Sequence, residues 1–257
     1  MTPLPRRIAA FFNLFPCPLC GGDGAGRNDL CPECRAKLEF IRAERRCPGC
    51  GGPLTGIMAR CEACLEGAAP RWLGAAAVFA YRGEARELIR RYKFGGEAVF
   101  AAPLGRLAAD AVRRENFAVD MLVPIPPDPF RTLLRSYDPV GLFAEVAAAE
   151  LGLPLKRALL RRPGGAAQST KNRSARLSDP RRHYIAAPGA ARKINGKRLL
   201  LTDDIFTTGA TLSAAAKALL GAGAEAVYIL VLARTPLLSG GGGGVPTPPS
   251  SSAEFLR

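Results

Sequence analysis

The sequence predicts an α/β protein in which a mainly parallel sheet is flanked by helices and preceded by a small cysteine-rich module. From residue 71 onward, short apolar runs of strand length alternate with Ala- and Leu-rich runs of helix length, which is typical of parallel α/β sheets. All eight cysteines lie before residue 65, in four Cys-x-x-Cys pairs. A chain of 257 residues has room for one α/β domain and one such module.

The four cysteine pairs predict two structural Zn²⁺ sites. Gaps of 10, 12 and 10 residues separate the pairs, and two glycines follow the first and third pairs, as a tight turn beneath a tetrahedral ion requires. Disulfides are disfavoured in the cytoplasm, where we expect this protein, and redox-active pairs do not occur four times in tandem. The expected ligands are Cys17, Cys20, Cys31, Cys34, Cys47, Cys50, Cys61 and Cys64. Pairing in order along the chain and an interleaved pairing both stay open.

The predicted zinc sites are closed, because four thiolates leave no coordination position for water or substrate. The module has few large apolar residues beyond Leu38, Phe40 and Ile41, so we expect it to need the metal in order to fold.

The α/β part is expected to run in the order strand, helix, helix, strand, helix, strand, strand, helix, strand. The expected strands are residues 73–81, 119–125, 156–160, 198–201 and 226–233, and the expected helices are residues 83–92, 104–112, 139–151 and 210–220. The basic residues 161–191 are interpreted as a loop. Because ligands bind at the carboxyl ends of parallel strands, residues 124–128, 161 onward and 203–211 are expected to face the ligand.

Both chain ends are expected to lie outside these two parts. Residues 1–16 begin like a signal peptide but lack a small-residue cleavage site, so an N-terminal amphipathic helix is the preferred interpretation. The Gly-rich and Ser/Pro-rich residues 237–257 predict a disordered tail. The expected organisation is therefore a leader at 1–16, a zinc-binding module at 17–70, an α/β domain at 71–236 and a tail at 237–257.

The formal net charge of +14 is concentrated in one stretch. Between Lys156 and Arg198 there are thirteen basic residues and one acidic residue, Asp179. Such a stretch suits a solvated surface, a phosphate-handling loop or a nucleic-acid contact, and composition does not choose between them. No stretch is long and apolar enough to span a bilayer, so we expect a cytoplasmic protein without membrane insertion.

One strand, loop and helix combine the groups that a ribose phosphate needs. Asp203 and Asp204 lie at the carboxyl end of a strand, where carboxylates can hold a ribose diol directly or through Mg²⁺. The backbone N–H groups and dipole of the following helix start can hold a phosphate together with the threonine hydroxyls. The phosphate-binding candidates are Thr207, Thr208, Gly209, Ala210 and Thr211. A P-loop is excluded, because no lysine follows the glycine.

This stretch resembles the PRPP-binding motif of type I phosphoribosyltransferases, in which apolar residues, two acidic residues and two variable ones precede Thr-Thr-Gly-x-Thr. Together with the cysteine pairs, the segment Arg-Arg-Tyr-Lys-Phe-Gly-Gly at 90–96 and Val-Pro-Ile-Pro at 123–126, it makes the chain similar to the ComF family. That family joins a double zinc ribbon to a type I phosphoribosyltransferase-like domain. Further matches are Arg135-Ser136-Tyr137-Asp138, where the family usually has Arg-Gly-Phe-Asn, and Gln168, Arg173 and Arg176.

The resemblance implies Mg·PRPP, or a related ribose 5-phosphate, as the ligand. It implies that residues 124–128 are the pyrophosphate loop and that Gln168, Arg173 and Arg176 lie in a mobile lid. As an enzyme, a phosphoribosyltransferase, the protein would use Asp203 and Asp204 on the ribose. Lys93, Arg135 and the lid arginines would assist departure of pyrophosphate. Lys93 and Arg135 are equally compatible with surface charges, and the acceptor base cannot be read from the sequence.

Two other functions stay open. The family's link with DNA uptake suggests a non-catalytic competence factor that binds single-stranded DNA and contacts the DNA-uptake machinery, with the basic stretch on the phosphates. Tyr184 is the only aromatic residue of that stretch, which favours phosphate contacts over base stacking. The third possibility is a PRPP or nucleotide sensor that keeps the fold without the reaction.

Overall fold

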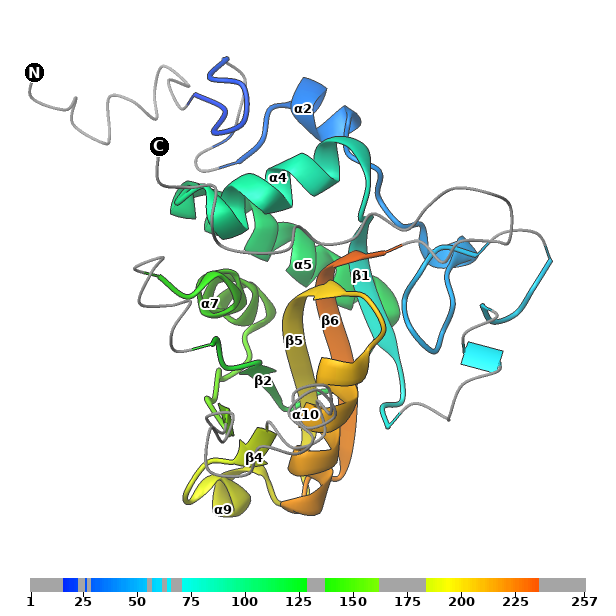
Figure 1. Cartoon of the computed structure of the whole chain (residues 1–257), viewed down its shortest axis with the longest axis vertical. Helices are drawn as coiled ribbons and strands as arrows, with labels where there is room; N and C mark the ends of the chain where they lie inside the picture. Colours follow the sequence, from blue (N-terminus) through cyan, green and yellow to red (C-terminus); the bar gives the residue numbers. More distant parts are fainter. Residues whose placement is uncertain are drawn as a thin grey trace, which may run out of the picture.

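A four-stranded parallel sheet is the centre of the described part of the chain (Figure 1). The computed structural model describes residues 16–22, 26, 29–54, 57–61, 64–65, 71–128, 137–161 and 184–235. In spatial order the strands are β1 (Ala75–Ala80), β6 (Ala226–Arg234), β5 (Arg198–Phe206) and β2 (Met121–Pro124). The expected parallel sheet with flanking helices is confirmed.

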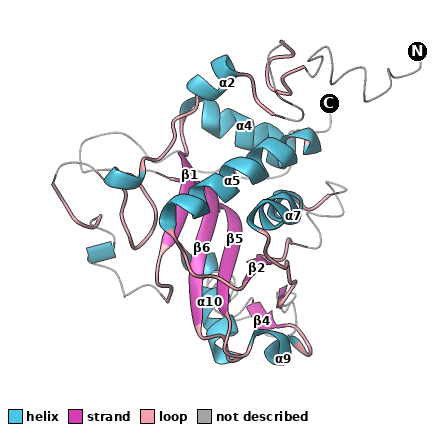
Figure 2. Cartoon of the chain, turned by 180° about the vertical axis from the view of Figure 1, so that it is seen from behind, coloured by secondary structure: helices cyan, strands magenta, loops and turns pink. Residues whose placement is uncertain are grey.

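Helices cover both faces of this sheet, as the two opposite views show (Figures 1 and 2). One face carries α4 (Gly83–Phe94), α5 (Ala101–Glu115) and α7 (Pro139–Leu151), and the other carries α10 (Ala210–Gly221). Side chains alternate between the faces: Leu200 packs with the first group of helices, and Leu199 and Leu201 pack on the side of α10. Burial on both faces explains why the strands are continuous apolar runs.

The start of α7 explains the residue that departs from the family pattern at position 138. Asp138 is the N-cap of this helix, and its Oδ1 accepts a hydrogen bond from the Gly141 N–H at 2.9 Å. Asn and Asp cap helices about equally well, so the change keeps the function of the position. Pro139 follows at the first helical position, where its missing N–H costs nothing.

Two strands differ from the sequence prediction in ways that matter for the site. β5 continues to Phe206, because its ladder with β6 runs on to the pair Phe206 and Arg234, so Asp203 and Asp204 lie within the strand. The strand expected at residues 156–160 has other bounds and another pairing than predicted. β3 (Leu159–Arg161) pairs antiparallel with β4 (Tyr184–Ala186) in a separate two-stranded sheet. Residues 154–156 reach the main sheet, through a parallel bridge between Leu155 and Leu122.

The segment interpreted as a loop also contains regular structure. Within residues 161–191, β4 and the start of α9 (Ala190–Ile194) are ordered elements. The buried side chains of Tyr184, Ala190 and Ile194 pack into the core on the side of α10. Burial against neighbouring elements thus overrides the basic composition of this stretch.

The two halves of the cysteine-rich module pack on opposite sides of the sheet. Cys17, Cys31 and Cys34 belong to the core formed with α4 and α5, and Cys47, Cys50 and Cys61 belong to the core on the side of α10. Residues 39–41 connect the halves and run antiparallel along β1, with Ile41 N–H donating to Val78 C=O at 2.9 Å. This connection covers the outer edge of the sheet. The module's short helices are α2 (Pro32–Ala36) and η1 (Ala43–Arg45).

Several predictions fall outside the described residues. These are the N-terminal helix within residues 1–15, the tail from residue 236, and the side chains of Arg135, Gln168, Arg173 and Arg176. Among the described residues, no helix combines the length and apolar character that crossing a bilayer requires.

Candidate functional site

The candidate site lies at the carboxyl-terminal edge of the sheet, where β5 leads into α10. Asp203 and Asp204 are consecutive strand residues, so their side chains point to opposite faces. Asp204 is on the same face as Leu200 and meets α4, whereas Asp203 is on the face of Leu199 and Leu201. One strand end therefore presents a carboxylate to each side of the sheet.

Lys93 from the last turn of α4 forms an ion pair with Asp204, through Nζ and Oδ2. The lysine side chain is 19% exposed and the aspartate side chain 9%, so water screens this pair only weakly. The sequence named both residues as candidates, and the structure brings them together across 111 positions of the chain. The pair fixes the orientation of the Asp204 carboxylate.

The surroundings of Asp203 disfavour the ionised form of its carboxyl. Burial and, second to it, repulsion by the Asp204 carboxylate raise the pKa of its carboxyl from 3.8 to about 7, although Lys93 and Arg161 act in the opposite direction. Its Oδ1 accepts a hydrogen bond from the Asp204 N–H at 2.9 Å. A buried carboxyl beside a second carboxylate favours a ligand that brings positive charge or hydroxyl donors.

The loop between β5 and α10, residues 206–210, has the shape of an anion site. Gly209 precedes the helix with φ +77°, and an added Cβ would lie 2.7 Å from Cζ of the Phe206 ring, so only glycine fits. Thr208 Oγ1 accepts a hydrogen bond from the Ala210 N–H at 3.4 Å, and Thr207 and Thr208 are exposed. The first turn of a twelve-residue helix brings N–H groups and a positive dipole end to this loop.

Arg161 and Tyr184 also belong to the site. The sequence placed Arg161 at a ligand-facing strand end without a role, and it named Tyr184 only as the single aromatic residue of the basic stretch. Arg161, at the end of β3, forms an ion pair with Asp128 at 3.2 Å, and its charge acts on Asp203. Burial raises the pKa of Tyr184, and its hydroxyl lies in the fields of Arg161 and Asp203. The only signal for Arg161 was its position directly after an expected strand. Because the sequence did not predict the partner strand β4, nothing in it indicated that Tyr184 lies close to the carboxylates.

The segment that follows β2 is held against β5. Ile125 N–H donates to Thr202 C=O at 2.9 Å, which places residues 124–128 beside the strand that carries the carboxylates. Asp128, at the end of this segment, is the residue paired with Arg161. Three chain segments thus meet at one edge: residues 124–128, the end of β3 and the start of α10.

The eight cysteines form two clusters that fit zinc. Cys17, Cys20, Cys31 and Cys34 make one cluster and Cys47, Cys50, Cys61 and Cys64 the other, with all ligand atoms of a cluster within 4.8 Å of one another. Thiolates bound to zinc at about 2.3 Å in a tetrahedron lie about 3.8 Å apart. The Sγ atoms of Cys20 and Cys31 are 3.8 Å apart, and those of Cys50 and Cys61 are 3.5 Å apart. The pairs therefore combine in their order along the chain.

Backbone N–H groups around these clusters point at sulfur. The Cys31 N–H lies 3.4 Å from Cys17 Sγ, and the Cys61 N–H lies 3.5 Å from Cys47 Sγ. Such N–H groups stabilise the negative charge of a thiolate, which is the form that binds zinc. The donor set and the spacing of the sulfurs thus suit two closed, structural zinc sites.

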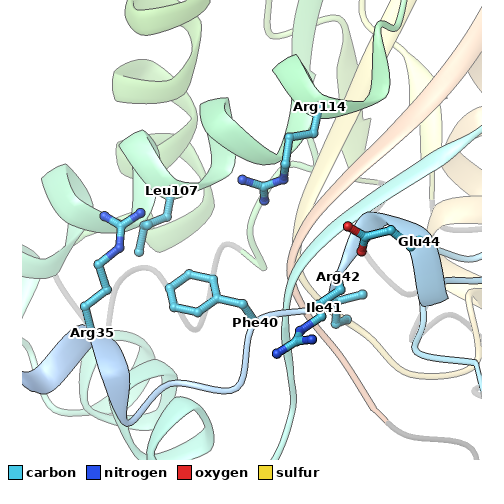
Figure 3. A pocket seen from close by; sticks show the side chains of 7 residues that line it. All are labelled: Arg35, Phe40, Ile41, Arg42, Glu44, Leu107 and Arg114. Atoms are coloured by element: carbon cyan, nitrogen blue, oxygen red, sulfur yellow. The ribbon is translucent and has the colours of Figure 1, made fainter. Parts of the chain in front are cut away.

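A concave surface lies away from the carboxylates, between the cysteine module and α5 (Figure 3). This hollow has a volume of about 320 Å³, and Figure 3 shows Phe40 between the side chains of Arg35 and Arg114. The Arg35 guanidinium carbon is 5.6 Å from the centre of the Phe40 ring. Its lining residues are Arg35, Phe40, Ile41, Arg42, Glu44, Leu107 and Arg114.

Known protein families match both the cysteine-rich module and the α/β domain. Residues 11–65 match the double zinc ribbon domain, and residues 142–237 match the phosphoribosyl transferase domain. The expected phosphoribosyltransferase-like fold with an N-terminal double zinc ribbon is thereby confirmed.

Several curated proteins are similar to this chain over most of their length. The chain is 29% identical to the competence protein ComFC of Streptococcus pneumoniae, over 81% of this chain and 90% of that protein. It is 30% identical to the competence protein ComFC of Bacillus subtilis, over 77% and 80%. With the competence protein F of Haemophilus influenzae it shares 28% identity, over 87% and 98%. Among solved structures, the glutamine PRPP amidotransferase of B. subtilis aligns with 18% identity and a TM-score of 0.40, over 55% of this chain and 30% of that one.

Proposed function

The chain belongs to the ComF family, and from this premise we propose that it binds a 5-phosphorylated ribose, with Mg·PRPP as the expected ligand, at the end of β5. One observation carries the proposal. The carboxylates of Asp203 and Asp204 and the anion-binding loop at 206–210 lie on one continuous β5–α10 connection. A ribose phosphate has a diol at one end and a phosphate at the other, and this connection offers a partner for each.

In this proposal each side chain has a definite task. Asp203 and Asp204 accept hydrogen bonds from the ribose hydroxyls, and residues 207–211 donate N–H and O–H groups to the 5-phosphate. Mg²⁺ prefers carboxylate and phosphate oxygens, and when bound it would neutralise pyrophosphate charge. The raised pKa of Asp203 supports this cofactor, because burial and the neighbouring Asp204 carboxylate disfavour the ionised form, which a bound cation would stabilise.

As an enzyme, the protein would transfer the phosphoribosyl group. The bond between ribose C1 and the pyrophosphate oxygen breaks, and a bond between C1 and an acceptor nucleophile forms. Positive charge develops on the ribose, which the two carboxylates stabilise, and negative charge develops on the leaving pyrophosphate. Arg161 lies within electrostatic reach of Asp203 and is a candidate to stabilise the pyrophosphate, together with Lys93 once the ligand has displaced it from Asp204.

The test is calorimetric titration with PRPP in the presence of Mg²⁺. We expect the native chain to bind, and the double variant Asp203→Asn with Asp204→Asn to lose at least tenfold in affinity. Asp110→Asn is the matched control, because this exposed carboxylate on α5 pairs only with Arg113 in the described part of the chain. Equal affinity of the double variant and the native chain would refute the proposed site.

A second candidate function is supported by the arginine-lined hollow. Relatives named competence proteins suggest a role in natural transformation, and we propose single-stranded DNA as a second ligand that lays its phosphates across Arg35, Arg42 and Arg114. Phe40 is the aromatic side chain there on which a base can stack. Replacing the three arginines by glutamine should weaken binding of a labelled oligonucleotide and flatten its salt dependence, and an unchanged salt slope would refute this contact.

A further inference from the structure

The loop at residues 206–209, called the phosphate loop below, is packed directly against the second cysteine cluster. Trp72 makes the first connection. Its indole Nε1–H donates to the backbone C=O of Gly49, between two zinc-ligand positions, at 2.5 Å. The same ring meets Phe206 edge to face, with ring centres 5.8 Å apart at 83°. Its Cη2 also lies 3.5 Å from the position that a Cβ on Gly209 would take.

Arg234, the last residue of β6, makes the second connection. Its side chain is buried, with 3% of the residue exposed, and Nη1 donates to the C=O of Phe206 at 3.2 Å and to the C=O of Thr207 at 2.7 Å. The guanidinium carbon lies 4.4 Å from the centre of the Phe206 ring. On its other side, Cγ lies 3.0 Å from the position that a Cβ on Gly52 would take, so the cluster's glycine turn lies directly on this arginine.

Charge complements these contacts. Four thiolates around one Zn²⁺ carry a net charge of −2, and the buried guanidinium of Arg234 lies beside the turn that follows Cys50. The same guanidinium is hydrogen-bonded to the carbonyls that shape the phosphate loop. A buried arginine is stable only where such partners balance its charge, so the metal site and the loop depend on the same side chain.

We infer that zinc in the second cluster holds the phosphate loop in its ligand-binding shape, through Trp72 and Arg234. The identity of the ligand rests on the proposed function, but the coupling between metal and loop does not. Without zinc, residues 47–61 lose the bonds that define their fold. Trp72 then loses the Gly49 carbonyl that accepts its hydrogen bond, and Arg234 loses its packing against Gly52. Both side chains that hold residues 206–209 are therefore less firmly fixed.

The first cluster provides an internal comparison. It packs against α4 and α5, where Leu19 C=O accepts a hydrogen bond from Arg91 Nη1 at 3.4 Å. Because this cluster is on the opposite side of the sheet from Trp72, losing its zinc should not loosen the phosphate loop directly. The two metals therefore have separable effects.

Trp72 itself provides the measurement, because it is the only tryptophan of the chain and is 9% exposed. The experiment compares the zinc-loaded full chain with two variants: Cys47→Ser with Cys50→Ser, and Cys17→Ser with Cys20→Ser. In the second-cluster variant we expect a red-shifted Trp72 emission, at least tenfold faster hydrogen exchange at residues 206–210 and at least tenfold weaker binding of Mg·PRPP. The first-cluster variant should keep the native emission and slow exchange. Native emission and exchange in the second-cluster variant would overturn the inference.

Milder variants keep the inference testable if the cysteine variants do not fold. Trp72→Phe removes the bond to Gly49 and the part of the indole that lies against Gly209, and Arg234→Lys keeps the charge but not the paired carbonyl contacts. Both should retain two zinc ions in a thiol-titration assay and show faster exchange at residues 206–210. Arg198→Lys, at the opposite end of β5, is the matched control. Unchanged exchange in both test variants would overturn the inference.

The outcomes also separate the two proposals. If the native chain does not bind PRPP, the proposed function fails, while emission and exchange still decide whether zinc holds the loop. If PRPP binds equally in all variants although the loop loosens, the inference that zinc sets the ligand-binding shape fails and the proposed function stands.

Discussion

Replacing Asp203 by asparagine should make the free energy of unfolding less dependent on pH and higher at pH 8. Burial and the neighbouring Asp204 raise the pKa of the Asp203 carboxyl in the folded protein to about 7, against 3.8 ordinarily. Between these two values the folded state binds a proton that the unfolded state has lost. The free energy of unfolding therefore decreases as the pH rises from about 4 to about 7, and the whole cost is present above pH 7.

The size of the effect follows from the same pKa values. A rise from 3.8 to about 7 corresponds to at most about 4 kcal/mol of destabilisation by the ionised carboxylate. The Asp203 residue is partly exposed, so water screens part of this cost, and we expect about 1–2 kcal/mol between pH 5 and pH 8. Asparagine has nearly the same size and does not ionise, so the variant should lack this decrease.

The assay is urea unfolding at pH 5, 6, 7 and 8 with saturating zinc, for the native chain, Asp203→Asn and the surface control Asp110→Asn. Zinc release from the unfolded cysteines depends on pH in all three chains, so only the difference between them reports Asp203. The native chain and the control should lose stability together from pH 5 to pH 8 relative to Asp203→Asn. Parallel curves for all three proteins would show that Asp203 titrates normally and would refute the charge balance described for the site.

Three further changes test other parts of the site. Lys93→Met leaves the buried Asp204 carboxylate without its cation and should cost about 2–4 kcal/mol in urea unfolding. Adding Asp204→Asn should recover most of this loss; no recovery would mean that the lysine stabilises the fold by packing alone. Gly209→Ala should cost about 2–3 kcal/mol, because it combines φ +77° with a ring collision, whereas Gly196→Ala, at φ +65° with open space, should cost about 1 kcal/mol. Equal costs would show that the loop relaxes freely. A zinc chelator should expose residues 17–64 to protease while the sheet strands stay protected, and unchanged cleavage there would contradict a metal-dependent module.

The sequence was most informative where the site is local. The carboxylates, the threonines and Gly209 occupy nine consecutive positions, and a strand followed by a helix start is enough to place them beside one another. The spacing of the cysteines was equally informative about the zinc sites, because four Cys-x-x-Cys pairs in tandem have few ways to combine into two clusters. Even there the strand end was misjudged. β5 includes both aspartates because its ladder with β6 continues past the last leucine, and polarity alone does not show where a ladder stops.

Contacts between distant segments could not be predicted in the same way. Three apolar residues at 158–160 suit a strand, but they do not say which strand they pair with, and the partner at residues 184–186 is hidden in a basic stretch. Lys93 was named for its place in a family segment, but nothing in the sequence indicated that Asp204 is its partner. Side-chain partners depend on packing, which a periodicity argument does not contain.

Arg234 shows what packing adds to the argument. In the sequence it is simply the charged residue at which an apolar strand ends, a position where most arginines reach solvent. Its burial would be unfavourable without compensation, yet its Nη1 contacts the carbonyls of Phe206, Thr207 and Thr235. Carbonyls that converge on one cation are held in a fixed arrangement, and here they shape the loop that precedes α10. Because a glycine turn of the second cluster covers the same arginine, the zinc module supports the loop that precedes α10 from behind and is not a separate attachment to the sheet.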